Sequence, residues 1–223
     1  QHFTVLRYDL LGHGDSIKPK GAYTMPQMVD QLHRLIDAQG HQHCVVIGFS
    51  LGGLIAKAFT LAHPDRVSAL VVMNSAHART DEQRAGIMLR VEQCRADGPG
   101  TTVSDALARW FSTGFIENNP ETIEKVRQWV LANGKQVYPE LYMLLANADI
   151  GMEEAISTIV CPTLILTGAE DYGNSAEMAE KMAVKIPGSR LAILQGLRHM
   201  ALVEDPPTVN RIVIGFLSTV FEE

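Results

Sequence analysis

The sequence predicts an α/β fold in which a mostly parallel sheet is covered by helices on both faces, with an all-helical segment inserted into it. Two observations predict this class. Short apolar, β-branched runs alternate with segments of helical spacing in the first and last thirds of the chain, as expected for parallel strands joined by helices. The strand signal then disappears over 78–157, where the apolar residues recur at helical spacing. At 223 residues the chain is long enough for one sizeable core.

The first third alternates strand and helix. We expect strands at 3–9, 43–48 and 68–74, and helices at 25–39 and 51–62. The first of these helices has a single apolar face, which is typical of a helix that lies on a sheet. That face consists of Met28, Leu32, Leu35 and Ile36.

The middle segment is helical, and Gly, Pro and Asn residues interrupt it between helices. We expect helices at 80–97, 101–114, 119–133 and 136–147. The alternation then resumes, with strands at 162–167 and 190–194 and helices at 174–185 and 207–220. The predicted domain organisation is therefore a core made of 1–77 and 153–223, with 78–152 inserted as a helical lid over the catalytic edge of the sheet.

A serine stands where a buried strand changes directly into a helix. The run 44–47 is apolar and β-branched, and after Ser50 the apolar residues recur at helical spacing. Such a turn strains the residue at its apex and needs small neighbours, and Gly48 and Gly52 flank the serine. The hydroxyl would then be exposed at the carboxyl edge of the sheet, with the Leu51 N–H free at the helix start to bind an oxyanion. This pattern predicts a nucleophile elbow.

A nucleophilic serine needs a base and an acid that orients the base. Glu170 and Asp171 directly follow the predicted strand 162–167, so both acids would lie at the same edge as the serine. His199 follows the last predicted strand and precedes the final helix, which makes it the candidate base. The chain order serine, acid, histidine is the one found in α/β hydrolases.

Motifs along nearly the whole chain outside the helical segment resemble the α/β-hydrolase superfamily. They lie at 8–16, 48–53, 63–67, 168–171 and 196–199. The resemblance implies Ser50 as nucleophile, His199 as base and Asp171 as acid, because the acid is expected three residues after Gly168. The sequences Asn74-Ser75-Ala76 and Arg109-Trp110-Phe111 are similar to relatives of 3-oxoadipate enol-lactonase.

The amino-terminal region departs from the family pattern. Members of the superfamily begin with two or three strands and a His-Gly loop that supplies the second oxyanion N–H, whereas 3–9 resembles the strand that follows that loop. We therefore expect either that further residues precede Gln1 in a longer polypeptide or that a second copy of the chain completes the sheet as a homo-oligomer. The Gly-His-Gly sequence within 12–16 is expected to be a structural turn and not the missing loop.

Charge and cysteine usage exclude several classes of partner. The net charge is −6 and no Lys/Arg tract occurs, which argues against binding to nucleic acid or to an anionic membrane. No apolar run approaches the ~20 residues that a membrane span needs. Three cysteines, Cys44, Cys94 and Cys161, are read as free thiols in a reducing cytoplasm. His41 and His43 lack a nearby third ligand, so we expect no metal and no cofactor.

Together these features predict a serine hydrolase that cleaves a small carboxylic ester or enol-lactone through an acyl-enzyme. Two alternatives stay open: a C–C bond hydrolase or haloperoxidase-like esterase with the same triad, and a non-catalytic binding protein with this fold. Arg109 could pair with a carboxylate on the substrate. The candidate substrate contacts are Phe49, Arg109, Trp110 and Met143.

Overall fold

A computed structural model describes residues 3–221 of the chain, and within them it contains a four-stranded sheet. The strands are β1 (Cys44–Phe49), β2 (Val67–Met73), β3 (Thr163–Gly168) and β4 (Arg190–Leu194). They lie in the order β1-β2-β3-β4, and each neighbouring pair is parallel. The predicted α/β class with a parallel sheet flanked by helices is confirmed.

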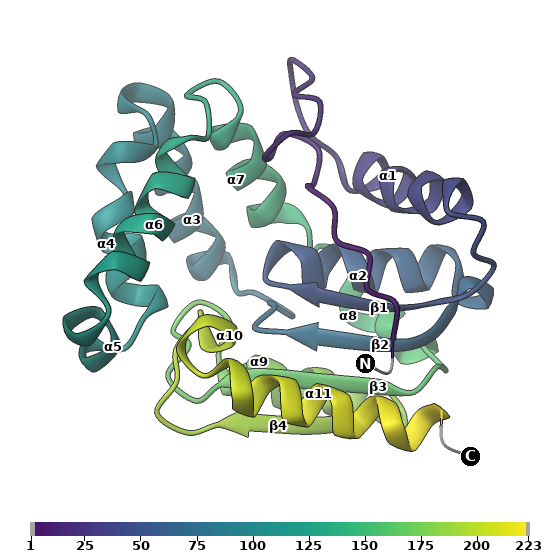
Figure 1. Cartoon of the computed structure of the whole chain (residues 1–223). Helices are drawn as coiled ribbons and strands as arrows, with labels where there is room; N and C mark the ends of the chain where they lie inside the picture. The colour runs from purple at the N-terminus through teal and green to yellow at the C-terminus, as the bar shows by residue number, and fades with distance from the viewer. Residues whose placement is uncertain (1–2, 222–223) are drawn as a thin grey trace.

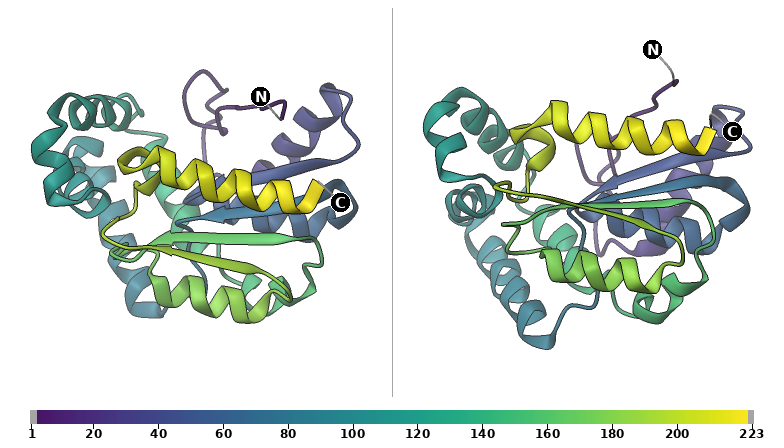
Figure 2. Two further views of the ribbon diagram at one scale, coloured as in Figure 1. Left: turned by 60° about the horizontal axis from the view of Figure 1, so that its bottom comes forward. Right: turned by 90° about the horizontal axis from the view of Figure 1, so that it is seen from below.

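Helices cover both faces of this sheet (Figures 1 and 2). One face packs on α1 (Met25–Ala38), α2 (Leu51–Ala62) and α9 (Ala176–Lys185), and the other packs on α11 (Pro206–Phe221). Along β2, Leu70 and Val72 point into the first layer, while Ala69 and Val71 face α11. Because both faces of a central strand are buried, β2 is apolar without interruption from Ala69 to Met73 and does not alternate with polar residues.

The predicted strand at 3–9 is wrong, because these residues are extended but join no sheet. A strand requires a neighbour that pairs with its backbone N–H and C=O groups. Among the described residues no strand pairs with this segment. Instead the Asp9 carbonyl accepts from Gln31 Nε2 at 3.0 Å, and Phe3 packs edge-on against Phe221 with ring centroids 6.2 Å apart.

The segment 12–16 forms a structural turn, as the resemblance to the α/β-hydrolase superfamily implied. The backbone N–H of Asp15 donates to the Asp9 carboxylate at 2.9 Å. Gly14 has a φ of +46°, and a Cβ at this position would lie 2.0 Å from the same carboxylate. The turn therefore requires glycine both for its backbone conformation and for the space that the Asp9 side chain occupies.

Between β2 and β3 the chain is helical. The main helices are α3 (Asp81–Asp97), α4 (Val103–Trp110), α5 (Thr113–Asn118), α6 (Pro120–Leu131) and α7 (Tyr138–Asn147), followed by the short α8 (Met152–Ala155). Figure 1 shows α3 to α6 beyond the arrowheads of the strands, at the carboxyl edge of the sheet. These helices have a hydrophobic cluster of their own, formed by Cys94, Val103, Leu107, Phe111, Ile123, Val126, Val130 and Tyr138. The division into core 1–77 and 153–223 and lid 78–152 stays a prediction.

The single helix expected at 101–114 is divided into α4 and α5. Phe111 is extended, with φ −118° and ψ 147°, and Ser112 caps α5 by accepting from the Phe115 N–H at 3.3 Å. The Phe111 carbonyl accepts from the Arg198 side chain. Long-range contacts and a local cap thus end a helix that apolar spacing alone would continue.

A buried ion pair joins the two ends of the helical segment. Asp149, which follows α7, accepts from the backbone N–H of Arg79 at 2.9 Å and from its guanidinium at 3.0 Å, and Arg84 Nη1 donates to it at 3.1 Å. The side chains of Asp149 and Arg79 are 2% and 3% exposed. Burial alone would raise the pKa of Asp149, but hydrogen bonds from Arg84 and Arg79 outweigh it and lower the pKa below its ordinary value.

We expect Asp149→Asn to lower the free energy of unfolding by about 3 to 5 kcal/mol, because two guanidinium groups then lose their buried counter-ion. The matched control is Asp30→Asn, which breaks an exposed pair with Arg34 and should cost about 0 to 1 kcal/mol. Urea unfolding at pH 7 measures both. Because the folded-state pKa is depressed, this contribution is present above the ordinary Asp pKa of about 4 and is lost as the pH falls below it. Equal effects of the two variants would contradict this role of Asp149.

Candidate active site

Three side chains from separate strand ends meet at the carboxyl edge of the sheet. Ser50 follows β1, Asp171 follows β3 and His199 follows β4. His199 Nε2 lies 3.1 Å from Ser50 Oγ, and His199 Nδ1 lies 2.7 Å from Asp171 Oδ2. Because a carboxylate can only accept, Nδ1 carries the proton and Nε2 is left to accept from the serine hydroxyl. The arrangement can activate the serine as a nucleophile.

Ser50 is held in a strained conformation. Its φ is +54° and its ψ is −117°, and its N–H donates to the Met73 carbonyl at 2.9 Å. A Cβ on Gly48 would lie 2.2 Å from the Gly52 carbonyl oxygen, and one on Gly53 would lie 2.5 Å from Ser75 Cβ. A Cβ on Gly52 would meet no described atom within 4 Å. In the described residues it is therefore Gly48 and Gly53, and not the expected Gly48 and Gly52, whose missing side chains permit the turn.

Asp171 is 3% exposed and accepts four hydrogen bonds. Besides His199, the donors are the backbone N–H groups of Gly173 and Asn174, each at 3.0 Å, and Asn74 Nδ2 at 2.9 Å. Burial on its own would raise the pKa of Asp171, but the hydrogen bonds outweigh it and hold the pKa below its ordinary value. The acid is therefore ionised at neutral pH and can orient the imidazole.

Asn74 is a member of this site that sequence reasoning missed. It follows β2 with a φ of +46°, a region that asparagine enters more readily than most residues. That conformation turns its amide toward Asp171 and also toward the Arg198 carbonyl, which lies 3.3 Å from Nδ2. The available signal was its position, since an asparagine directly after a central strand stands at the same edge as the serine and the acid.

Glycine also lets the loops of the acid and the histidine approach each other. A Cβ on Gly168 would lie 2.3 Å from the Leu197 carbonyl oxygen. The N–H of Glu170 donates to that same carbonyl at 3.0 Å. The Glu170 side chain points away from the imidazole, with Oε2 3.7 Å from Arg198 Nε. Of the two candidate acids, only Asp171 contacts His199.

The Leu51 N–H has the position that an oxyanion donor requires. Leu51 is the first residue of α2, and its N–H has no hydrogen-bond acceptor among residues 3–221. The first N–H groups of a helix have no partner within the helix, and the helix dipole favours negative charge there. The structure thus places a free donor directly after the Ser50 nucleophile candidate.

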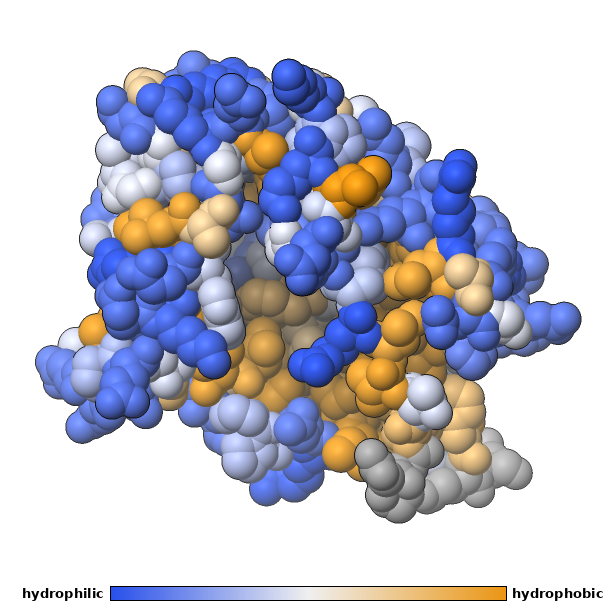
Figure 3. Space-filling view, turned by 45° about the horizontal axis from the view of Figure 1, so that its top comes forward, coloured by the Kyte–Doolittle hydropathy of each residue, from blue (hydrophilic) through white to orange (hydrophobic). Residues whose placement is uncertain are grey.

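Two of the four candidate substrate contacts lie beside the histidine. The rings of Phe49 and Trp110 are centred 5.0 Å and 6.2 Å from the His199 imidazole. Figure 3 shows a hollow in one face of the molecule with apolar residues, in orange, around it. An apolar surrounding excludes water and strengthens the electrostatic interactions of the site.

Met143 is not among the residues that contact the triad, and its expected contact with substrate stays a prediction. It lines a cavity of about 590 Å³ together with Ala58 and Leu61 of α2 and Tyr23. Ala58 is eight residues beyond Ser50, which is ~12 Å along the helix axis. The position of Met143 in the sequence did not predict that it lines this cavity, because the direction in which a helix face points depends on packing.

Arg109 is half-buried on α4 and has no acidic partner among residues 3–221. Arg90 of α3 is also half-buried and unpaired there, and its Nε atom is inaccessible and without a hydrogen-bond partner. Burial lowers the pKa of Arg90, and the positive charge of Arg109 lowers it further. Two neighbouring guanidinium groups without a counter-ion are suited to bind an anion.

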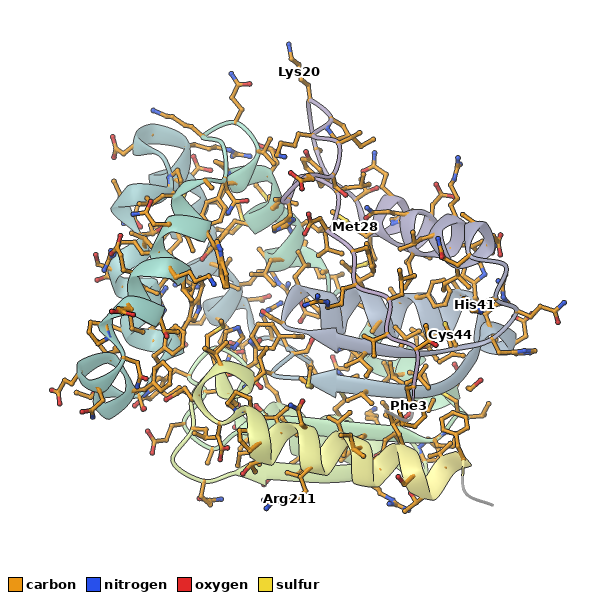
Figure 4. All side chains as sticks on the ribbon, in the orientation of Figure 1. Phe3, Lys20, Met28, His41, Cys44 and Arg211 are labelled. Atoms are coloured by element: carbon orange, nitrogen blue, oxygen red, sulfur yellow. The ribbon has the colours of Figure 1, made fainter. Side chains whose placement is uncertain are left out.

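The other sequence-predicted features lie away from this edge. Figure 4 shows His41 and Cys44 at the amino end of β1, opposite the carboxyl edge. Residues 3–221 contain no group of three or more His, Cys, Asp or Glu side chains placed to hold a metal ion. Within the same residues, all three cysteines are free thiols, and every helix is too short or too polar to cross a membrane.

Comparison with protein families gives one match over most of the chain. The model of the family described as "alpha/beta hydrolase fold" matches residues 1–206. This match spans the strands, the helical segment and all three residues of the serine, histidine and aspartate cluster.

Relatives and solved structures that resemble the chain include proteins named as hydrolases, lactonases and esterases. The chain is 27% identical to an (E)-2-((N-methylformamido)methylene)succinate hydrolase of Acinetobacter baylyi, over 98% of this chain and 82% of the relative. It is 29% identical to 3-oxoadipate enol-lactonase 2 of the same organism, over 95% and 77%. A thermophilic esterase from Thermogutta terrifontis with malate bound superposes with a TM-score of 0.87 at 29% identity, over 95% of this chain and 78% of the esterase.

We expect Asn74→Gly to raise the pKa of Asp171, because the carboxylate loses one of its donors while the backbone keeps its freedom to adopt a positive φ. Titration of the Asp171 carboxyl carbon by NMR measures the change. The control is Ala78→Gly, since Ala78 has a φ of +50° in the same loop but is not a partner of the carboxylate. An unchanged Asp171 titration in Asn74→Gly would show that the amide does not stabilise the charged acid.

Proposed function

The chain belongs to the α/β hydrolase fold family, and from that premise we propose that it is a serine hydrolase that cleaves a small carboxylic ester or lactone. The observation that carries the proposal is the continuous hydrogen-bonded line from Ser50 Oγ through His199 to Asp171, with distances of 3.1 Å and 2.7 Å. The strained backbone at Ser50 and the free N–H of Leu51 add the two further features that acyl transfer requires.

In the proposed mechanism Ser50 Oγ attacks the substrate carbonyl while His199 Nε2 takes the hydroxyl proton. Asp171 fixes the imidazole tautomer and stabilises the imidazolium that forms. The Leu51 N–H binds the oxyanion of the tetrahedral intermediate. When this intermediate collapses, the imidazolium gives its proton to the leaving oxygen and the acyl group stays on Ser50.

Water then releases the acyl group by the same steps. His199 Nε2 removes a proton from the water, which attacks the acyl carbonyl, and the proton returns to Ser50 Oγ as the acid leaves. The mechanism needs no cofactor, since each proton moves between the substrate, water and these side chains.

The substrate that we propose carries a carboxylate apart from the bond that is cleaved. Arg109, one residue before Trp110 on α4, and the neighbouring Arg90 offer two positive charges that have no acidic partner among residues 3–221. The relatives support this class, since one hydrolyses a succinate derivative, one is an enol-lactonase, and the esterase holds malate. Phe49 and Trp110 would contact the apolar part of the substrate. The free thiols favour a reducing compartment such as the cytoplasm.

The opposing possibility is a binding protein that has this fold without catalysis. A fluorescent phosphonate that reacts with activated serines separates the two, because it labels only a serine with a working base. Labelling at Ser50 that is lost in His199→Ala supports the hydrolase. No labelling of the folded wild-type chain would favour the binding protein.

We expect Ser50→Ala and His199→Ala each to lower kcat for an ester substrate by ~10³-fold or more, because the residues act as a unit. Asp171→Asn should have a somewhat smaller effect, since the imidazole keeps its place but loses the carboxylate. Glu170→Gln is the matched control and should leave kcat unchanged. Steady-state hydrolysis of 4-nitrophenyl acetate measures all four, and loss of activity in Glu170→Gln alone would reassign the acid.

We expect Arg109→Ala to raise KM for a carboxylated ester by about 10-fold or more, since a hydrogen bond to a charged group is worth ~1.5 to 3 kcal/mol. KM for 4-nitrophenyl acetate should not change. The control is Arg95→Ala, which removes an arginine already paired with Glu92 and Glu140 and should affect neither substrate. Equal effects of Arg109→Ala on both substrates would assign Arg109 to packing of the helical segment.

A further inference from the structure

The turn that carries His199 is bonded on both sides to a single stretch of the helical segment, residues 108–112. On one side, Arg198 Nη1 donates to the carbonyls of Ala108 at 2.8 Å and Phe111 at 2.9 Å. On the other side, the N–H of Met200 donates to the Trp110 carbonyl at 2.9 Å. The residues directly before and after the histidine are therefore both fixed to the end of α4.

Glu204 makes a further contact between the His199 turn and residues 108–112. It is the last residue of α10 (Ala201–Glu204), five positions after the histidine. Its Oε2 accepts from the backbone N–H of Ser112 at 3.1 Å and from the Ser112 hydroxyl, while its Oε1 accepts from the Arg198 N–H at 3.3 Å. The Glu204 carboxylate thus links Ser112, the last residue of 108–112, to Arg198, the residue before His199.

We propose that Glu204 is a positioning residue that holds His199 and Trp110 in one fixed relation. Asp171 holds the imidazole itself from the sheet, while Glu204 holds the turn that carries the imidazole from the side of the helical segment. The Glu204 carboxylate fixes the position of residues 108–112 relative to the imidazole. It therefore keeps the Trp110 ring 6.2 Å from the ring of His199 and prevents the turn at 198–200 from shifting relative to Ser50.

This arrangement predicts which kinetic constant depends on Glu204. Proton transfer between Ser50 Oγ and His199 Nε2 is sensitive to displacement, and a misplacement of ~1 Å can cost ~10²-fold in rate. A small ester makes few contacts with the helical segment, so the binding of the ester depends little on the position of that segment. Loss of the carboxylate should therefore lower kcat and leave KM for a small ester nearly unchanged.

The proposal rests on the proposed function, and the test separates the two. Phosphonate labelling and hydrolysis of 4-nitrophenyl acetate are first measured on the wild-type chain, and absence of both would overturn the hydrolase proposal whatever Glu204 does. Where the wild type is active, we expect Glu204→Ala to lower kcat by about 10-fold or more with KM within about threefold. Glu204→Gln, which keeps one acceptor oxygen, should recover part of the loss.

Ser112→Ala tests the same contact from the other side and guards against a failure of Glu204→Ala to fold. Both variants remove the contact between the Ser112 hydroxyl and Glu204, although Ser112→Ala also removes the cap on the Phe115 N–H, so the loss of kcat in the double variant should be smaller than the sum of the two single losses. The matched control is Glu180→Gln, an exposed acid on α9 that has no ion-pair partner among residues 3–221, and it should not change kcat. Folded Glu204→Ala and Ser112→Ala chains that keep wild-type kcat, or losses that simply add in the double variant, would overturn the proposal.

Discussion

The buried carboxylate of Asp171 is the interaction on which the rest of the site depends. A charge removed from water must be compensated by hydrogen bonds, or it becomes neutral. The donors come from its own turn, from Asn74 at the end of β2 and from His199 at the end of β4. Satisfying this one group therefore brings three strand ends together and gives the imidazole the tautomer that can accept a proton from Ser50.

The approach of these loops is possible because glycines leave room for it. Gly48 lets the serine turn close onto the start of α2, and Gly168 lets the acid turn lie against the carbonyl of Leu197. The strain at Ser50 is tolerated because β1 and α2 on either side of it are packed in the core through Val46, Leu54 and Ile55. The packed sheet and the glycine-containing turns together hold the Ser50 hydroxyl in a fixed position.

The helical segment is held by two sets of contacts that have different roles. At its base, Asp149 binds Arg79 and Arg84 in a buried cluster, which ties the start of α3 to the end of α7. At its far end, Arg198, Met200 and Glu204 bind 108–112 next to the histidine. The first contact fixes the fold of the segment, and the second fixes its position over the site.

The sequence by itself determined the features that depend on neighbours along the chain. The change from strand to helical spacing at Ser50 and the alternation of strands and helices follow from local periodicity and turn chemistry, and the α/β class follows from them. The turn at 12–16 and the chain order of serine, acid and histidine are what the resemblance to α/β hydrolases implied. Only the tertiary structure decided which acid faces the histidine, because Glu170 and Asp171 differ by one position but point in different directions.

Contacts between distant parts of the chain decided the rest. The role of Asn74 depends on a hydrogen bond to a residue 97 positions away, which no periodicity reveals. The extended segment 3–9 is not a strand because no described strand pairs with it, and the end of α4 at Phe111 depends on a donor from Arg198. The cavity that holds Met143 is likewise set by packing against α2. Side-chain direction and backbone pairing are properties of the packed chain, so only the assembled fold settles them.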